Sequence, residues 1–203
     1  MSPEEVLAFW FPPGLDADEP THRAAVMRWF RGGTNAEIVA RFQPTLAAAI
    51  AGELDDWATT PRGRLALILV LDQFSRGIHR DAAAAYAQDA RAQELAIAGL
   101  DRGEHLALPI WEQMFFVLPL GHSENLMLQE RSVALAEALI EQAPPALRGI
   151  YAMAAESARS HREVIRRFGR HPHRNAALGR ESTPEEAAYI AAGAFPHQKS
   201  VKP

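Results

Sequence analysis

Apolar residues recur every three or four positions along most of this chain, which is the spacing of one face of an α-helix. The clearest example runs from Tyr151 to Phe168, and His161 lies inside its apolar stripe. No segment shows the sustained two-residue alternation of a half-buried strand. The pattern therefore predicts an all-α protein of about nine helices, near residues 3–10, 20–31, 35–51, 61–75, 89–102, 109–118, 124–142, 147–169 and 184–193.

Capping residues mark where several of these helices begin. Ser2–Glu5 and Thr183–Glu186 share one design, in which a hydroxyl cap precedes proline and two acids in the first turn. Thr34 and Glu37 have the spacing of a capping box, with each side chain reaching the backbone of the other. Further candidate caps are Thr60, Asp89 and Ser123.

Glycine and proline mark where helices end. Gly52, Gly103 and Gly169 each follow a helical segment, as expected of C-terminal caps. Pro44 lies inside segment 35–51, so we expect that helix to kink or break there.

Length and composition predict one soluble globular domain. The chain has 203 residues, of which 48% are apolar and 23% charged, which is enough apolar material for one substantial core. We expect a single helical domain over residues 1–195 and a flexible C-terminal tail over 196–203.

The absence of cysteine excludes disulfides, thiolate nucleophiles and cysteine-ligated metals, and it fits a reducing cytoplasm. The N-terminal segment carries acids where a signal peptide would be positive. Apolar runs such as Leu65–Leu71 are far shorter than the roughly 20 residues of a membrane span. We therefore predict a cytoplasmic protein without a membrane partner.

Positive charge concentrates in residues 159–175, which hold six arginines and three histidines against a single acid, Glu163. Gly169 is expected to end the helix here, and Pro172 stiffens the turn that follows. Two interpretations stay open at this point. His161 is either a hydrogen-bonded core histidine or a functional group, and the arginines form either a solvated face or an anion site.

An acid interrupts the most apolar predicted helix. In the sequence LALILVLDQFSRGIHR, Asp72 follows seven apolar residues, where an unpaired carboxylate would be costly. Asp72 and Arg76 are four residues apart and can pair within the helix. Alternatively, Asp72 holds an arginine from residues 159–175, so that guanidinium groups stand ready for an oxyanion.

A third polar group lies in the sequence LPLGHSENLMLQER. Pro119 and Gly121 are expected to break the chain, so that His122 and Glu124 crowd the start of the next helix, an end that favours anions. His122 and Glu124 have the chemistry of an acid–base pair or of two metal ligands. Plain helix capping explains the same residues.

These segments resemble a known family. The stretches LDQFSRGIHR, GHSENLMLQERSVALAEAL and HREVIRRFGRHPHRNAALGRESTPEE, with VLAFWF and GELDDW, are similar to the bacterial family known as domain of unknown function 924. The similarity extends from about Val6 to Phe195. The resemblance implies an all-helical fold like that of tetratricopeptide proteins, and it implies no particular activity.

The three polar segments are also the family's signature segments, so we expect them to converge on one pocket between helices. The candidate catalytic groups are His161, His122 and Glu124. The candidate ligand-binding residues are Asp72, Arg76, Arg162, Arg170, His173, Arg174 and Asn175.

Two functions fit this sequence. In the first, arginines bind a small metabolite carrying phosphate or carboxylate, and a histidine titrating near neutrality can serve catalysis. In the second, the polar segments are structural and a helical groove binds a peptide or protein. No P-loop, nucleophile elbow or HExxH motif is present, so the sequence leaves open whether a reaction is catalysed. No cofactor is predicted, and the oligomeric state is not indicated.

Metal and nucleic-acid binding are disfavoured. His171, His173 and Glu124 offer ligand atoms, but the neighbouring arginines would repel a cation. The net charge is −4, and the chain has only two lysines, Lys199 and Lys202, both in the tail. That charge does not suit a phosphate backbone, so we predict no nucleic-acid partner.

Overall fold

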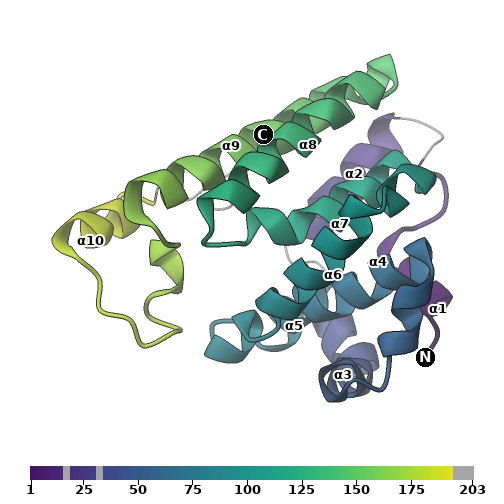
Figure 1. Ribbon diagram of the computed structural model, residues 1–203, viewed down its shortest axis with the longest axis horizontal. Helices are drawn as coiled ribbons and strands as arrows, with labels where there is room; N and C mark the ends of the chain where they lie inside the picture. The colour runs from purple at the N-terminus through teal and green to yellow at the C-terminus, as the bar shows by residue number, and fades with distance from the viewer. Residues whose placement is uncertain (16–18, 31–33, 194–203) are drawn as a thin grey trace.

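The computed structural model describes residues 1–15, 19–30 and 34–193, and these residues form helices and connecting turns without strands (Figure 1). The predicted tail, residues 196–203, lies outside the described residues. The α-helices are α1 (Pro3–Trp10), α2 (Glu19–Phe30), α3 (Asn35–Ala51), α4 (Pro61–Leu69), α5 (Ser75–Ile78), α6 (Asp89–Asp101), α7 (Ile110–Gly121), α8 (Leu126–Gln142), α9 (Arg148–Phe168) and α10 (Pro184–Ala191).

Short helical turns connect or interrupt these elements. They are η1 (Asp55–Thr59), η2 (Val70–Phe74), η3 (Ala83–Tyr86), η4 (Glu104–Ala107), η5 (Pro145–Leu147) and η6 (Pro172–Arg174). Since α4, η2 and α5 follow one another without a break, the described residues form nine helical rods, which confirms the predicted all-α fold. Within this part of the chain, no helix is both long and apolar enough to cross a bilayer.

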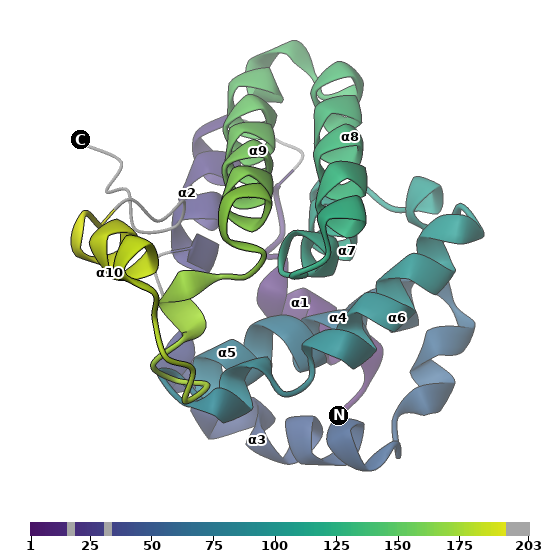
Figure 2. The same cartoon turned by 60° about the vertical axis from the view of Figure 1, so that its left-hand side comes forward.

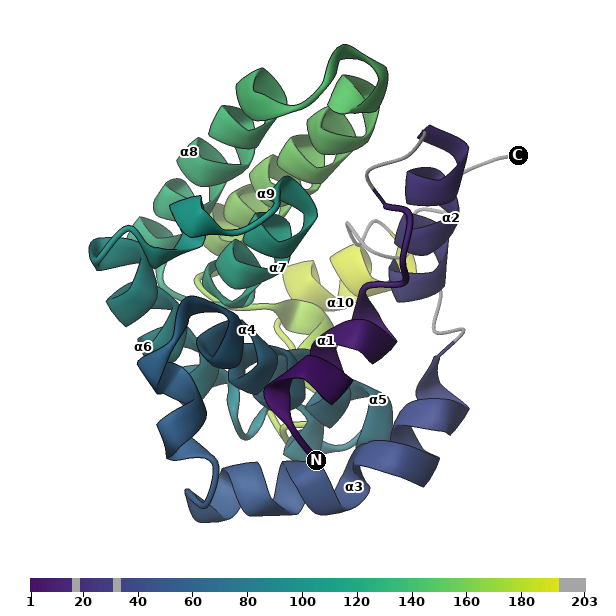
Figure 3. The ribbon, with the colours of Figure 1, turned by 90° about the vertical axis from the view of Figure 1, so that its right-hand side faces the viewer.

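The helices enclose one core around α4. This helix packs against α1, α6 and α7, and α3 covers the η2 turn that continues it (Figure 3). Aromatic rings fill the centre, where the Trp10 ring lies 5.6 Å from that of Phe74 and 5.5 Å from that of Phe115. Both phenylalanines are almost fully buried. Such edge and tilted ring contacts add to the free energy of burying these large side chains.

Helices α8 and α9 form an antiparallel hairpin beside this core, and α7 connects the two parts through its packing on α8 (Figure 2). After α9 the chain turns at Gly169, where a left-handed backbone of φ 68° makes glycine favourable. The segment then passes through η6 and reaches α10, which packs against η6. The route returns residues 170–180 to the junction between the hairpin and the core.

The capping predictions are confirmed at three helix starts and wrong at Thr34; at one of the three, the start of α4, the Thr60 hydroxyl accepts from the Gly63 amide. Ser2 and Thr183 each form a complete capping box with the glutamate three residues later. Thr34 makes no capping hydrogen bond with its side chain. Its backbone is in the helical region, at φ −107° and ψ −6°, instead of the extended one that a cap requires.

Proline interrupts neither α3 nor α7, so a break at Pro44 is wrong, whereas a kink there stays a prediction. Helix α3 runs from Asn35 to Ala51 without a break at Pro44. Helix α7 likewise includes Pro119 in its last turn. A proline removes only one helical hydrogen bond, and buried side chains on both sides of Pro44, including Phe42 and Leu46, anchor that helix to the core.

The rod from Pro61 to Ile78 contains an irregular turn that the sequence did not predict. Residues Val70–Phe74 are π-helical, and the amide of Ser75 donates to the carbonyl of Val70, five residues earlier. A π turn changes the direction of the side chains around it, and such turns are frequent at functional sites. Asp72 lies at the centre of this one.

Candidate functional site

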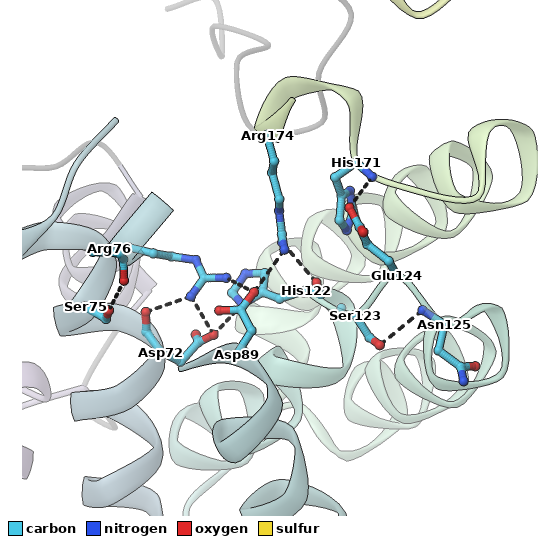
Figure 4. Close-up of polar contacts among 12 residues, drawn as sticks. Asp72, Ser75, Arg76, Asp89, His122, Ser123, Glu124, Asn125, His171 and Arg174 are labelled. Carbon is cyan, nitrogen blue, oxygen red and sulfur yellow. Dashed lines mark hydrogen bonds and ion pairs between the residues drawn. The ribbon is translucent and has the colours of Figure 1, made fainter. Parts of the chain in front are cut away.

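Asp72 is the centre of a buried hydrogen-bond network at the π turn (Figure 4). The residue is 1% exposed. Its Oδ1 accepts from Nη1 of Arg76 at 2.9 Å and from Nδ1 of His122 at 2.6 Å. The side-chain amide of Gln73 donates to Oδ2. Burial alone would raise the pKa of Asp72, but Arg76 and His122 outweigh it and hold this pKa well below its usual range.

The Asp72 contact determines how His122 presents its ring. Because the carboxylate accepts, Nδ1 of His122 must carry the proton, and in the neutral ring Nε2 then holds the lone pair. The His122 side chain is 17% exposed, and Nε2 forms no hydrogen bond within the described residues. The result is a histidine fixed at one nitrogen and available at the other.

Two arginines meet next to this pair. Nη2 of Arg76 and Nη1 of Arg174 both donate to Oδ2 of Asp89, each at 2.9 Å. Both guanidinium groups also lie over the ring of Tyr86, at 5.6 Å and 4.7 Å from its centroid. Arg174 further donates to the carbonyl of His122 at 3.0 Å, so the arginine pair and the histidine form one unit.

This arginine pair leaves two buried atoms unused. Within the described part of the chain, Nε of Arg174 and Oδ1 of Asp89 have no hydrogen-bond partner, although neither atom is reached by solvent. Burial and the adjacent Arg76 lower the pKa of Arg174 below its usual range. A buried donor and a buried acceptor without partners are costly to the folded state.

A second network follows along residues 170–186. Glu124 accepts from the backbone amide of His171 at 2.8 Å and from both terminal nitrogens of Arg180, at 2.8 and 3.0 Å. Nε of Arg180 donates to Oδ1 of Asn175 at 3.0 Å. These bonds fasten the turn after α9 to the start of α8, and the hydrogen bonds from Arg180 and from the His171 amide lower the pKa of Glu124 against its burial.

The same network extends into α10. Asn175 donates to Glu186 at 3.3 Å, and Arg170 donates to both oxygens of Glu186, at 2.6 and 2.7 Å. The hydrogen bond from Arg170 is the largest cause that lowers the pKa of Glu186 to about 2. Glu186 therefore serves both the capping box of α10 and a paired arginine.

Three histidine rings cluster under this turn. His171 is 1% exposed, and its ring lies 5.8 Å from that of His161 and 5.3 Å from that of His173. Nε2 of His171 is buried and finds no hydrogen-bond partner in the described ranges, and burial holds the pKa of this ring far below its usual range. Nδ1 of His161 bonds the carbonyl of Ser157 at 2.8 Å. No group of acidic or histidine side chains within the described ranges has the arrangement of a metal site.

Nine of the ten candidate residues are thus divided among three places. Asp72, Arg76, His122 and Arg174 share the first network, and Glu124, Arg170 and Asn175 share the second. His161 and His173 belong to the ring cluster. Arg162 lies apart from these groups and pairs with the exposed Glu130 of α8 at 3.2 Å.

Some expected pairings differ in the structure. Asp72 pairs within its helix with Arg76, and the arginine that arrives from residues 159–175 binds Asp89 instead. His122 and Glu124 do not pair with each other, because each has a separate partner. Helix α8 is capped by the side chain of Asn125, not by Ser123, whose hydroxyl accepts from the Asn125 amide.

Four participants were missed in the sequence: Tyr86, Asp89, Arg180 and Glu186. Asp89 was interpreted as a cap, whereas Gln88 takes that position and leaves the carboxylate to the arginines. Each of the four arginines in these networks pairs with an acid, and two of the four, Arg170 and Arg174, belong to the positive segment 159–175; the acids are Asp72, Asp89, Glu124 and Glu186.

Two surface pockets, of about 360 and 310 Å³, lie elsewhere on the protein, and none of the ten candidate residues lines either one. The first is formed by α1, the loop after it and the starts of α4 and α7. The second lies between η1, α4 and α6. A ligand of the Asp72 network would therefore bind outside these two pockets, next to the partly exposed side chains of His122 and Arg76.

Together the described residues define an all-helical protein with a buried carboxylate, histidine and arginine network at its centre. The chain belongs to a bacterial family of proteins of unknown function, DUF924, whose model matches residues 6–194. A solved structure of a protein of unknown function from Agrobacterium tumefaciens is similar, with a TM-score of 0.76 and 32% sequence identity. That similarity covers 94% of this chain and 97% of the other. The comparison with curated proteins gives no match.

Proposed function

We propose that this protein binds a small cytoplasmic metabolite carrying phosphate or carboxylate beside His122, and that His122 acts on it as a general base or acid. The observation that carries the proposal is the 2.6 Å contact between Asp72 and Nδ1 of His122. A buried carboxylate that holds one ring nitrogen orients the other for proton transfer, as in carboxylate–histidine pairs of many enzymes.

The arginine pair supports an anionic ligand. The side chains of Arg76 and His122 are 21% and 17% exposed, and both contact Oδ1 of Asp72. Nε of Arg174 is a buried donor without a partner, placed on a side chain that already contacts the His122 carbonyl. Guanidinium groups that the protein already orients bind planar oxyanions with little loss of side-chain entropy.

Ligand-dependent thermal stability tests the proposal. Inorganic phosphate, pyrophosphate, glycerol 3-phosphate and malate are each added at up to 10 mM to the wild type and to His122→Gln. A ligand at 100 times its Kd stabilises by about 2.7 kcal/mol, which corresponds to about 6 °C in a chain of this length. Arg162→Ala is the matched control, because Arg162 pairs with Glu130 away from the network.

We expect one of these anions to raise the Tm of the wild type and of Arg162→Ala, and His122→Gln to abolish any turnover of a phosphate ester while still folding. If none of the four anions changes the Tm, the proposed ligand class is wrong. If a ligand binds but His122→Gln keeps full turnover, the catalytic role is wrong and binding remains.

The second candidate function is a scaffold similar to tetratricopeptide proteins, which binds a peptide or protein through exposed side chains. The observation in its favour is that α8 and α9 form an antiparallel hairpin with exposed apolar residues, among them Met127, 80% exposed, and Met153, 49% exposed. Here the polar networks only hold the helices together. Replacing both methionines with Gln would then remove partner binding, whereas His122→Gln would leave it unchanged.

A further inference from the structure

The 360 Å³ pocket at the start of α7 has features of a binding site that is separate from the His122 network. Its walls include Leu7 of α1, Trp111 of α7, Phe11 directly after α1 and the loop residues 12–15. This size lies within the usual range for small-molecule sites, which are mostly apolar with few polar groups. Glu112 lies in the first turn of α7, and His122 directly follows the last residue of this helix, so the two sites are separated by roughly 15 Å of helix.

Glu112 is the polar group of this pocket. It is 3% exposed, and Nη1 of Arg62 donates to its Oε1 at 2.6 Å. The other oxygen, Oε2, is buried and has no hydrogen-bond partner among the residues that the structure describes. A carboxylate oxygen without a donor is costly in a buried position, so a ligand N–H that reached it would recover free energy.

The charge around this oxygen selects the kind of donor. Glu4 and Glu112 line the pocket against one cation, Arg62, whose side chain is half exposed. The rings of Phe11 and Trp111 supply faces that attract cations. Arg62 already binds Oε1 as a cationic N–H donor, and this leaves Oε2 for a second donor of the same kind.

We propose that this pocket binds a small organic amine in its protonated form, with the ammonium group at Glu112 and an apolar or aromatic body between Leu7, Phe11 and Trp111. The ammonium donates to Oε2 of Glu112, and the rest of the ligand displaces water from the apolar wall. The site is independent of the function proposed for His122.

Isothermal titration calorimetry with three probes of one shape tests the charge requirement. The probes are phenethylamine, 2-phenylethanol and 3-phenylpropionate. They carry an ammonium group, a neutral hydroxyl and a carboxylate at the end of the same phenylethyl group. We expect phenethylamine to bind at least tenfold more tightly than the alcohol and the carboxylate not to bind. Equal affinity for amine and alcohol, or no binding of the amine at 10 mM, overturns the proposal.

Two variants locate the site. Glu112→Gln keeps the shape of the side chain and removes its charge, and we expect it to weaken phenethylamine binding at least tenfold. Ala8→Trp adds a ring at the exposed pocket mouth without touching Glu112, and we expect it to abolish binding, which decides the question if Glu112→Gln does not fold.

The matched controls are Glu94→Gln, which removes an exposed carboxylate from the other pocket, and His122→Gln. Both should bind phenethylamine as the wild type does. Wild-type affinity in Glu112→Gln and Ala8→Trp would place the amine elsewhere and overturn the assignment. A loss of binding in His122→Gln would merge the two sites and refute their independence.

Discussion

Replacing Asp72 with Asn removes one charge from the centre of the network while keeping the side chain's shape. The amide accepts through one oxygen only, and its NH₂ group must face Gln73, Arg76 or His122, each of which donates to the carboxylate. The variant therefore leaves two buried N–H donors facing each other without an acceptor between them. It also replaces the charged acceptor of Nδ1 of His122 with a neutral one.

The expected cost follows from the surroundings of the lost charge. Breaking a buried ion pair by removing one partner typically costs about 3–5 kcal/mol. Arg76 keeps its bond to Asp89 and is 21% exposed, so the low end applies, about 3 kcal/mol. With an unfolding entropy of about 2 cal/mol/K per residue over 203 residues, Tm should fall by about 7 °C.

Urea unfolding at pH 7, followed by tryptophan fluorescence, measures this difference in the free energy of unfolding. The control is Glu130→Gln, which breaks an exposed pair with Arg162 and should cost less than about 0.5 kcal/mol. Because the pKa of Asp72 is lowered in the folded state, its contribution is present above the unfolded pKa of about 3.9 and is lost at lower pH. A cost for Asp72→Asn no larger than that of the control would refute the structural role given to this carboxylate.

Other predictions concern pH, packing and capping. Burial lowers the folded-state pKa of His171, so the unfolded chain alone gains a proton as pH falls below about 6.5, and stability should decrease by up to about 1.4 kcal/mol per pH unit. His171→Phe should lack this decrease when urea unfolding at pH 7 and 5.5 is compared, and an equal decrease would contradict the assignment. Gly99→Ala places a methyl group 2.5 Å from Cζ of Phe116 and should cost about 1–3 kcal/mol in calorimetry. In Gly149→Ala the methyl meets nothing within 4 Å, so that control should gain about 0.5 kcal/mol. Thr183→Ala removes the 3.2 Å cap on the Glu186 amide and should cost about 1 kcal/mol, and an unchanged urea midpoint would show that the cap is dispensable.

Local features of the fold were predictable because they depend on neighbouring residues. Ser2 and Thr183 start helices as expected, and Gly169 ends one in a left-handed conformation. The absence of a break at Pro44 was not predictable, because it depends on core packing on both sides of the proline. Local rules consider only the hydrogen bond that a proline removes. The stability of the folded helix also includes the burial of its other side chains.

The candidate site was predictable in part for the same reason. Asp72 and Arg76 are one helical turn apart, and their pairing is confirmed. Arg174 meets Asp89 across 85 residues, and no sequence pattern selects that acid among the others. The π turn that carries Asp72 was likewise not predictable, because the spacing of apolar residues does not distinguish a π turn from regular α-helix.

The long sequence separations in the network have a kinetic consequence. The α8–α9 hairpin joins neighbouring segments, whereas Asp72 and His122 are 50 residues apart and Arg174 and Asp89 are 85 apart. We expect the contacts that close these large loops to form after the main folding barrier has been crossed, which gives them low φ-values. Losing about 3 kcal/mol there should speed unfolding about a hundredfold and leave the refolding rate nearly unchanged. The buried charges would thereby determine the lifetime of the folded state and not the rate of folding.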